Sequence, residues 1–460
     1  MDDLYTEANR QLTICNSCRY CEGYCAVFPA LERRTLLETG DITHLADLCH
    51  DCRACFTACM YAPPHEFALN PPAVLSEVRR RTYASYLPRL PGLSRLRRPA
   101  GDSGAASGSE VAGRSGAPGD GAGAADGSGV TGTPRVAVSS EVATSSELVS
   151  SSGVVGSSSG VAGDSGMADG SGVAGTPGTP GPADLARLAR LARFNWLRGR
   201  GGAVAVVLVA AAGVAAAALL ARGHGAPGSP YRVITYPALL VLAGVPCLWS
   251  LAVIVVAAAR YWRDTCGSFR VLRDVRALAA AARNAATLRY LRGGGAECSY
   301  PRDDPSPARR HLHACVAYGF LACVASTVAA AIEQDLAGQP PPYPVLSAPV
   351  LLGLAGGIGL LAGCAGLIVL KERADPVPSD PDMTSRDYGL LTALAVLAAT
   401  GLLALLLRGT AAYPPVLAVH LVTVVASFAV APYTKFTHFV FRVLALVQDS
   451  AETMAGRRET

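Results

Sequence analysis

Two short stretches near the N-terminus decide how this chain folds: CNSCRYCEGYC at residues 15–25 and CHDCRACFTAC at residues 49–59. Both place four cysteines in the spacing C-x2-C-x2-C-x3-C, and together they hold eight of the fourteen cysteines in the 460-residue chain. The N-terminus is acidic and polar and has no apolar core, so no secretory signal peptide is expected. The thiols should therefore meet a reducing compartment, where clustered cysteines indicate metal rather than disulfides.

Three thiolates at positions i, i+3 and i+6 can wrap around one face of a cubane cluster, while the fourth cysteine points away. Both runs resemble those of bacterial two-cluster ferredoxins. That resemblance implies a small α+β domain with two 4Fe–4S clusters, whose ligands are exchanged between the runs. They are Cys15, Cys18, Cys21 and Cys59 for cluster 1, and Cys49, Cys52, Cys55 and Cys25 for cluster 2.

The runs depart from the ferredoxin pattern where a proline normally follows the fourth cysteine, because Ala26 and Met60 stand there. Zinc is the main alternative, since four-cysteine zinc sites also use C-x2-C pairs. Such sites rarely contain three cysteines in series with two-residue spacers, and here that series occurs twice. The pattern favours iron–sulfur clusters over zinc.

Composition divides the chain into further segments. A cysteine domain at residues 1–99 is followed by residues 100–183, which are almost entirely Gly, Ser, Ala, Val, Asp and Pro and predict a disordered linker. Arginines at every third position predict an amphipathic interfacial helix over residues 184–200, or a solvated basic helix. Residues 201–445 then form a predicted membrane domain, with a tail at residues 446–460.

The membrane domain contains apolar runs long enough to span a bilayer. Six are predicted, at residues 203–221, 234–259, 314–332, 345–370, 389–407 and 415–432. Arginine and lysine are abundant in the connections on one side and scarce in those on the other. By the positive-inside rule, both termini and the cysteine domain are expected on the cytoplasmic side of a bacterial inner membrane. The sequence shows no basic face with interleaved aromatic residues, so binding to nucleic acid is not expected.

Histidines in or beside these runs are candidate haem ligands, because ionisable groups in a bilayer are costly and mark function. His420 and His438 lie 18 residues apart and would share one face of a single last helix. His313 opens the third run at the predicted level of His438, and His311 is the weaker alternative to it. Interfacial histidines bonded to headgroups, and a buried His420 without iron, are the competing interpretations.

The sequence from His420 to His438 resembles the last helix of the γ subunit of respiratory nitrate reductase. This resemblance implies a bundle of that kind, with an inner haem b between His313 and His438. It makes His420 a candidate ligand of an outer haem, whose second ligand should lie about ten residues after His313. Position 323 is a cysteine instead.

Longer strings carry a resemblance to the tricarballylate/citrate utilisation protein family (TcuB, also called CitB), which is related to the membrane-linked half of the cobalamin-pathway protein CobZ. They are CRYCEGYCAVFP at 18–29, LCHDCRAC at 48–55, MYAPPHEF at 60–67 and YGFLAC at 318–323. The Gly/Ser-rich insert at 100–183 departs from the short connection expected in that family.

The family resemblance implies an electron-transfer protein in the lipid bilayer with no substrate chemistry of its own. It would reoxidise a partner FAD-dependent dehydrogenase (TcuA-like) and pass electrons to quinone. Two alternatives stay open: a redox partner in corrin-ring (precorrin-3B) oxidation, and a membrane transporter or sensor with a metal-binding domain. The predicted spans carry no charged residue at mid-depth, so an ion path is unsupported.

Overall fold

The computed structural model describes residues 3–88, 210–216, 218, 228–265, 267–295, 298–300 and 304–459. The predicted linker at 100–183 and the interfacial helix at 184–200 lie outside these residues. So does most of the first predicted span, of which residues 210–216 and 218 are described and helical.

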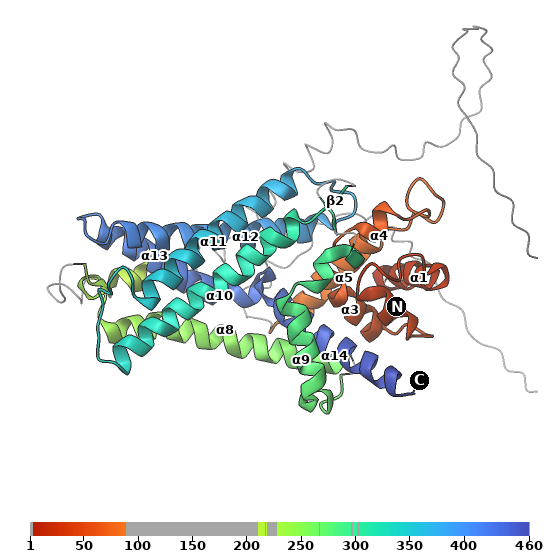
Figure 1. Cartoon of the computed structure of the whole chain (residues 1–460), viewed down its shortest axis with the longest axis horizontal. Coiled ribbons are helices and arrows are strands. Elements are labelled where there is room, and N and C mark those ends of the chain that lie inside the picture. The colour runs from red at the N-terminus through yellow and green to blue at the C-terminus, as the bar shows by residue number, and fades with distance from the viewer. Residues whose placement is uncertain are drawn as a thin grey trace, which may run out of the picture. The chain divides into compact units, whose positions relative to one another are not determined.

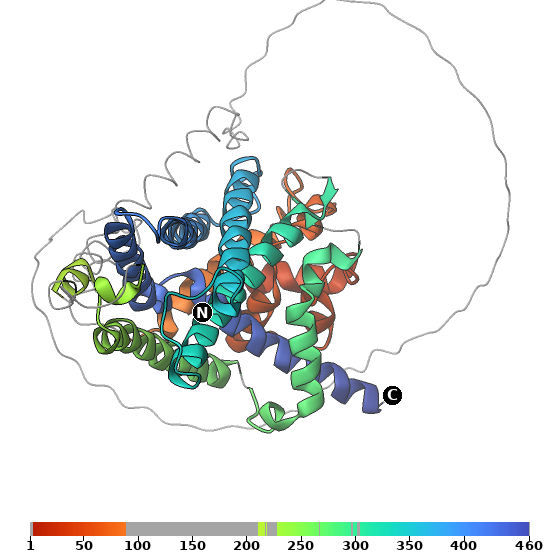
Figure 2. The same ribbon diagram turned by 60° about the vertical axis from the view of Figure 1, so that its left-hand side comes forward.

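Five helices in the described part are long and apolar enough to cross a membrane, and they coincide with the other five predicted runs. They are α8 (Tyr236–Asp264), α10 (Ala308–Asp335), α11 (Ala348–Glu372), α12 (Pro381–Leu406) and α13 (Tyr413–Val430). The two views in Figures 1 and 2 show them running alongside one another. Contacts follow the order α10, α11, α12, α13, α8, and the outward residues are largely apolar and exposed, as lipid contact requires.

Helices are the only regular secondary structure in residues 3–88 of the cysteine domain, so the predicted α+β content is wrong there. Its elements are α1 (Asp3–Cys18), α2 (Val27–Glu32), α3 (Thr39–Leu48), α4 (Ala54–Thr57) and α5 (Pro71–Tyr86). The segment between the two cysteine runs becomes α3 because Asp41 accepts a hydrogen bond from the Glu38 backbone N–H at its start (3.1 Å). Ile42, Leu45 and Leu48 then turn into the core.

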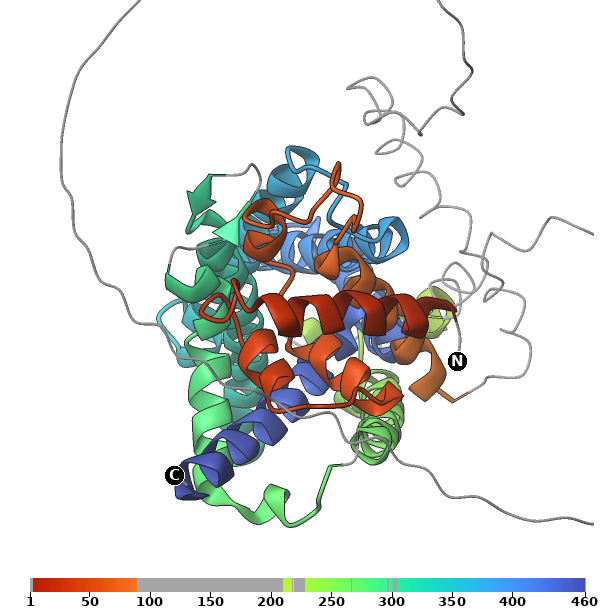
Figure 3. The same ribbon diagram turned by 90° about the vertical axis from the view of Figure 1, so that its right-hand side faces the viewer.

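One hydrophobic core joins the cysteine domain to one end of the membrane helices (Figure 3). Tyr83 of α5 stacks on Phe441 with 4.7 Å between ring centroids, and Tyr261 of α8 packs against the same ring. Gly40 meets the Asp264 carbonyl so closely that a side chain would collide with backbone. The two parts therefore belong to one compact unit.

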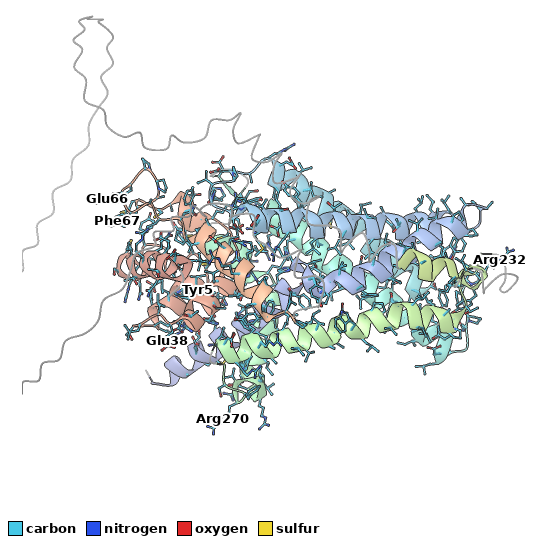
Figure 4. All side chains as sticks on the ribbon, turned by 180° about the vertical axis from the view of Figure 1, so that it is seen from behind. Tyr5, Glu38, Glu66, Phe67, Arg232 and Arg270 are labelled. Carbon is cyan, nitrogen blue, oxygen red and sulfur yellow. The ribbon has the colours of Figure 1, made fainter. Side chains whose placement is uncertain are left out.

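The connection between α8 and α10 lies at the end that carries the cysteine domain. It contains η3 (Val271–Arg273), α9 (Val275–Ala286), η4 (Arg289–Gly295) and a two-strand ladder of β1 (Cys298–Ser299) with β2 (Pro305–Ser306). Arg270 lies at this end together with Tyr5 and Glu38 (Figure 4). Arg232, in η2 (Pro230–Arg232), lies at the opposite end.

The last predicted helix is broken, which corrects the expectation that His420 and His438 share one straight helix. After α13 come η5 (Ala431–Tyr433), an extended Thr434, η6 (Lys435–Thr437) and α14 (His438–Glu459). Pro432 lacks a backbone N–H for a helical hydrogen bond, and the Thr434 hydroxyl accepts from Phe436 N–H (3.2 Å), which starts a new turn. The segment assigned as a tail belongs to α14 as far as Glu459.

Glycines let α10 and α11 pack so closely that their backbones are in contact. A Cβ at Gly319 would stand 2.6 Å from the Leu360 nitrogen and 2.9 Å from the Gly356 oxygen, and one at Gly356 would stand 2.8 Å from the Cys323 nitrogen. Small residues allow this close packing of membrane helices.

We expect Gly319→Ala to lower the free energy of unfolding by about 1–3 kcal/mol, because its methyl group would press on backbone atoms that cannot move aside. Gly244→Ala on α8 is the matched control, since nothing lies within 4 Å of its Cβ position. It should stabilise the helix by about 0.5–1 kcal/mol. Thermal unfolding in detergent checks this, and shifts of the same sign would contradict the packing described.

Candidate metal centres

The first cysteine run folds back on itself at the end of α1. Cys15 and Cys18 lie in the last turn of α1, and Arg19 then adopts a left-handed backbone (φ 54°) that turns the chain towards Cys21. A small cavity there is lined by Cys15, Cys18, Cys21 and Cys59, with Cys55 and apolar side chains. The four cysteines expected for cluster 1 are therefore brought together, although Cys59 belongs to the second run.

The second run wraps in a similar way after α3. Cys49 caps that helix, Cys52 lies between two left-handed residues, Asp51 (φ 52°) and Arg53 (φ 65°), and Cys55 lies in α4. The Asp51 N–H donates to the Cys49 sulfur (3.4 Å). Non-glycine residues in this conformation are costly, and such strain is concentrated at functional sites.

The thiols of the two runs lie close enough to affect one another's ionisation. Burial raises the pKa of Cys15 and Cys21 to about 12, and repulsion from neighbouring thiols, Cys18 and Cys59 among them, adds to this. Burial likewise raises the pKa of Cys25 to about 12, with further contributions from Cys49 and Cys21. Thiolates crowded in this way repel one another, so they need a cationic centre to hold them ionised.

Among the residues described, no group of three or more Cys, His, Asp or Glu side chains converges on one ion position. Tetrahedral zinc requires four ligands about 2.3 Å from one point, whereas a 4Fe–4S cluster binds each thiolate through its own iron. The exchange of Cys25 and Cys59 between the two runs stays a prediction.

Two arginines from the membrane half bind the backbone of the second run. Arg309 of α10 donates to the carbonyls of Asp51 and His50 (3.0 Å to His50). Arg442 of α14 donates to the Cys49 carbonyl (2.7 Å), which also accepts from Arg79 of α5 (2.8 Å). These guanidinium groups place positive charge around the second thiol set, which favours a more reduced, more negative centre.

His313 and His438 meet directly, as the sequence predicted. Their ring centroids lie 6.4 Å apart with the rings at 86°, and two imidazoles that share a metal at about 2 Å from each nitrogen would have centroids about 6 Å apart. The His438 Nδ1–H donates to the Lys435 carbonyl (2.6 Å), which leaves Nε2 free as an acceptor. Burial lowers the pKa of His438 to about 3, so the ring is neutral, as ligation requires.

The two other candidate histidines are not brought to this pair. His311 is exposed, so it is no competitor to His313. His420 lies in α13, where the Thr400 hydroxyl and its Nδ1 are 3.0 Å apart and Gly401 leaves room for the ring. That arrangement is a partly buried, hydrogen-bonded histidine, which agrees with the interpretation that competes with an outer haem.

Sequence reasoning missed Cys298, which lies in β1 far from both runs. Its side chain is fully buried, packs in one cluster with Cys52, and donates to the Leu291 carbonyl (3.1 Å). The sequence carries no local signal for this contact, because 246 residues separate Cys298 from Cys52. It brings a ninth thiol beside the second set.

The chain has two lysines, and both pair with one carboxylate. Lys371 at the end of α11 lies 2.6 Å from Asp387 of α12, and Lys435 pairs with the other carboxylate oxygen. All three side chains are largely buried, with exposures of 14–21%. This ion-pair cluster ties α11 and α12 to η6 directly before His438.

Two family models and one relative are similar to this chain. A model described as citrate utilization protein B matches residues 199–459, and one described as its Fer4-like domain matches residues 8–85. Citrate utilization protein B of Escherichia coli is 30% identical over 98% of this chain and 93% of its own length. No solved structure matches.

We expect Asp387→Asn to lower the free energy of unfolding by about 3 kcal/mol, because it leaves two buried ammonium groups facing each other without a counter-charge. Asp382→Asn, also on α12, is the control: its side chain is 61% exposed, and its loss should cost less than about 1 kcal/mol. Thermal unfolding measures both. Equal small shifts would show that the cluster contributes little to stability.

Proposed function

Because this chain belongs to the citrate utilization protein B family, we propose that it is a membrane-bound iron–sulfur electron carrier. It takes electrons from a separate FAD-dependent dehydrogenase of a tricarboxylic acid and passes them towards quinone. The match of residues 8–85 to a Fer4-like domain indicates iron–sulfur binding. The contacts between the second cysteine run and the membrane helices support a path between the two parts of the chain.

The observation that carries the proposal is the link from that run to the histidine pair. Arg309 lies four residues before His313 on α10, and Arg442 lies four residues after His438 on α14. Residues four apart occupy neighbouring turns on one helix face. Both candidate haem ligands therefore lie one turn from an arginine that is hydrogen-bonded to the backbone between Cys49 and Asp51.

We assign two 4Fe–4S clusters to the cysteines. Cluster 1 takes Cys15, Cys18, Cys21 and Cys59, and cluster 2 takes Cys49, Cys52, Cys55 and Cys25. Cys18 is exposed, while Cys49 and Cys52 are buried against the membrane half. Cluster 1 is then the entry for electrons from the flavoprotein, and cluster 2 faces the histidines.

We assign the space between His313 and His438 to haem b. Bound there, haem would supply a one-electron centre at the end of the bundle beside cluster 2. The chain fixes the orientation of the His438 ring through the Lys435 carbonyl. The arginine-rich end of the bundle would face the cytoplasm under the positive-inside rule, where a soluble flavoprotein can reach cluster 1.

The crossed ligand sets predict a distinctive pattern of iron content. Anaerobically purified protein should hold about eight iron atoms per chain, and Cys15→Ala or Cys59→Ala alone about four. Cys15→Ala with Cys59→Ala should still hold about four, because both serve one cluster. Cys15→Ala with Cys25→Ala should hold almost none.

Iron analysis and electron paramagnetic resonance of the reduced protein measure this pattern. Cys364→Ala is the control, because Cys364 is buried among the membrane helices and should leave all the iron in place. The reverse result for the two double variants would mean that each run binds its own cluster. Stoichiometric zinc without iron would refute the assignment.

The histidine pair predicts which histidine substitutions remove the haem and which do not. His313→Ala and His438→Ala should each abolish the haem b α-band of the dithionite-reduced protein, because one axial ligand cannot hold the haem in place. His311→Ala, two residues from His313 but exposed, should retain it. Equal loss in His311→Ala, or a full α-band in His438→Ala, would be incompatible with the pairing.

A further inference from the structure

An arginine-lined hollow lies on the connection between α8 and α10. It has a volume of about 400 Å³ and is lined by Arg283, Asn284, Thr287, Arg289 and Arg292. The residues come from the last turn of α9 and from η4, which follows it directly. No acidic side chain is among those that line it.

The three guanidinium groups are available to bind an anion. All three arginines are exposed, and none takes part in the ion pairs recorded between described residues, in contrast to Arg33, Arg34 and Arg80 in the cysteine domain. Three unneutralised charges around one hollow repel each other in the absence of a counter-charge. A negatively charged group bound in the hollow would relieve this repulsion.

Contacts with α10 set the depth of the hollow relative to the bilayer. The Tyr318 hydroxyl donates to the carbonyl of Ala286, the last residue of α9, and Arg310 donates to the Thr287 carbonyl (3.1 Å). Tyr318 lies ten residues into a membrane-crossing helix with half of its surface exposed (51%). In Figure 1, α9 runs crosswise to α8 at this end of the bundle. Tyrosines of this kind mark the membrane–water interface.

We propose that this hollow, the arginine hollow, binds the headgroup of an anionic phospholipid. Guanidinium groups bind phosphate oxygens in bidentate fashion, and basic pockets at the ends of membrane helices recognise anionic headgroups. A free anion could reach the same charges, but the contact of Tyr318 with the end of α9 favours a position at the membrane–water interface, where lipid phosphate is concentrated. The site does not depend on the iron–sulfur assignment.

A headgroup bound in the arginine hollow would restrict the movement of η4, the segment that packs against part of the second cysteine set. Leu291 lies between Arg289 and Arg292 in η4, and it packs in one buried cluster with Cys52 and Cys298. A phosphate held by both arginines would fix this segment from its outer side.

The test compares two triple variants of the full-length protein in nanodiscs. Arg283→Gln/Arg289→Gln/Arg292→Gln removes the hollow's charge, and Arg270→Gln/Arg273→Gln/Arg276→Gln removes equal charge from the neighbouring segment, which does not line it. Affinity is measured by energy transfer to fluorescent phosphatidylglycerol in phosphatidylcholine nanodiscs. The first variant should lose at least about tenfold in affinity, and the second less than about twofold.

Three results would overturn the proposal. One is an equal loss in both variants, which would mean unspecific attraction to a charged surface. Another is no preference of the unaltered protein for phosphatidylglycerol over phosphatidylcholine. The third is displacement of the lipid by inorganic phosphate or citrate at low millimolar concentration, which would identify a small-anion site. Iron content measured on the same samples shows separately whether the cluster assignment holds.

Discussion

The structure depends on one constraint: a loop crowded with thiols has to be held against the end of a membrane bundle. The backbone from Cys49 to Asp51 lies outside regular secondary structure, so its carbonyls need donors from elsewhere in the chain. Arg79, Arg309 and Arg442 supply them. Guanidinium groups suit this role because they stay charged when buried and donate several hydrogen bonds in fixed directions.

The same contacts connect metal binding to the membrane half. A metal centre in the second run would be surrounded by positive charge from α5, α10 and α14, and two of these helices also carry the histidines. Positive charge near a centre favours its reduced state. Lys371 and Lys435 share the single carboxylate of Asp387, so this cluster keeps a net positive charge beside His438. Arginine supplies the positive charge that contacts the cysteine backbone, and the lysine cluster holds the helices beside His438.

The sequence predicted features that rest on local spacing or on composition. The two cysteine runs, the five described membrane helices and the meeting of His313 with His438 follow from such patterns. The strand content of the cysteine domain was wrong because ferredoxin-like cysteine spacing does not determine the segments between the ligands, and here Thr39–Leu48 forms a helix. The break at Thr434 was missed because a single proline in an apolar run does not show whether the helix ends there or only bends. Cys298 and the contacts of Arg309 and Arg442 could not be predicted, since they join residues more than 240 positions apart.

The proposed function requires electrons to pass from the cysteine domain to the histidine pair within one chain. Flash photoreduction of the anaerobic protein by a deazaflavin, followed at the cluster and haem absorption bands, measures this transfer. We expect early bleaching of the cluster band, then its recovery at the same rate as the haem α-band grows. A bleached cluster band with no linked growth of a haem band would contradict it.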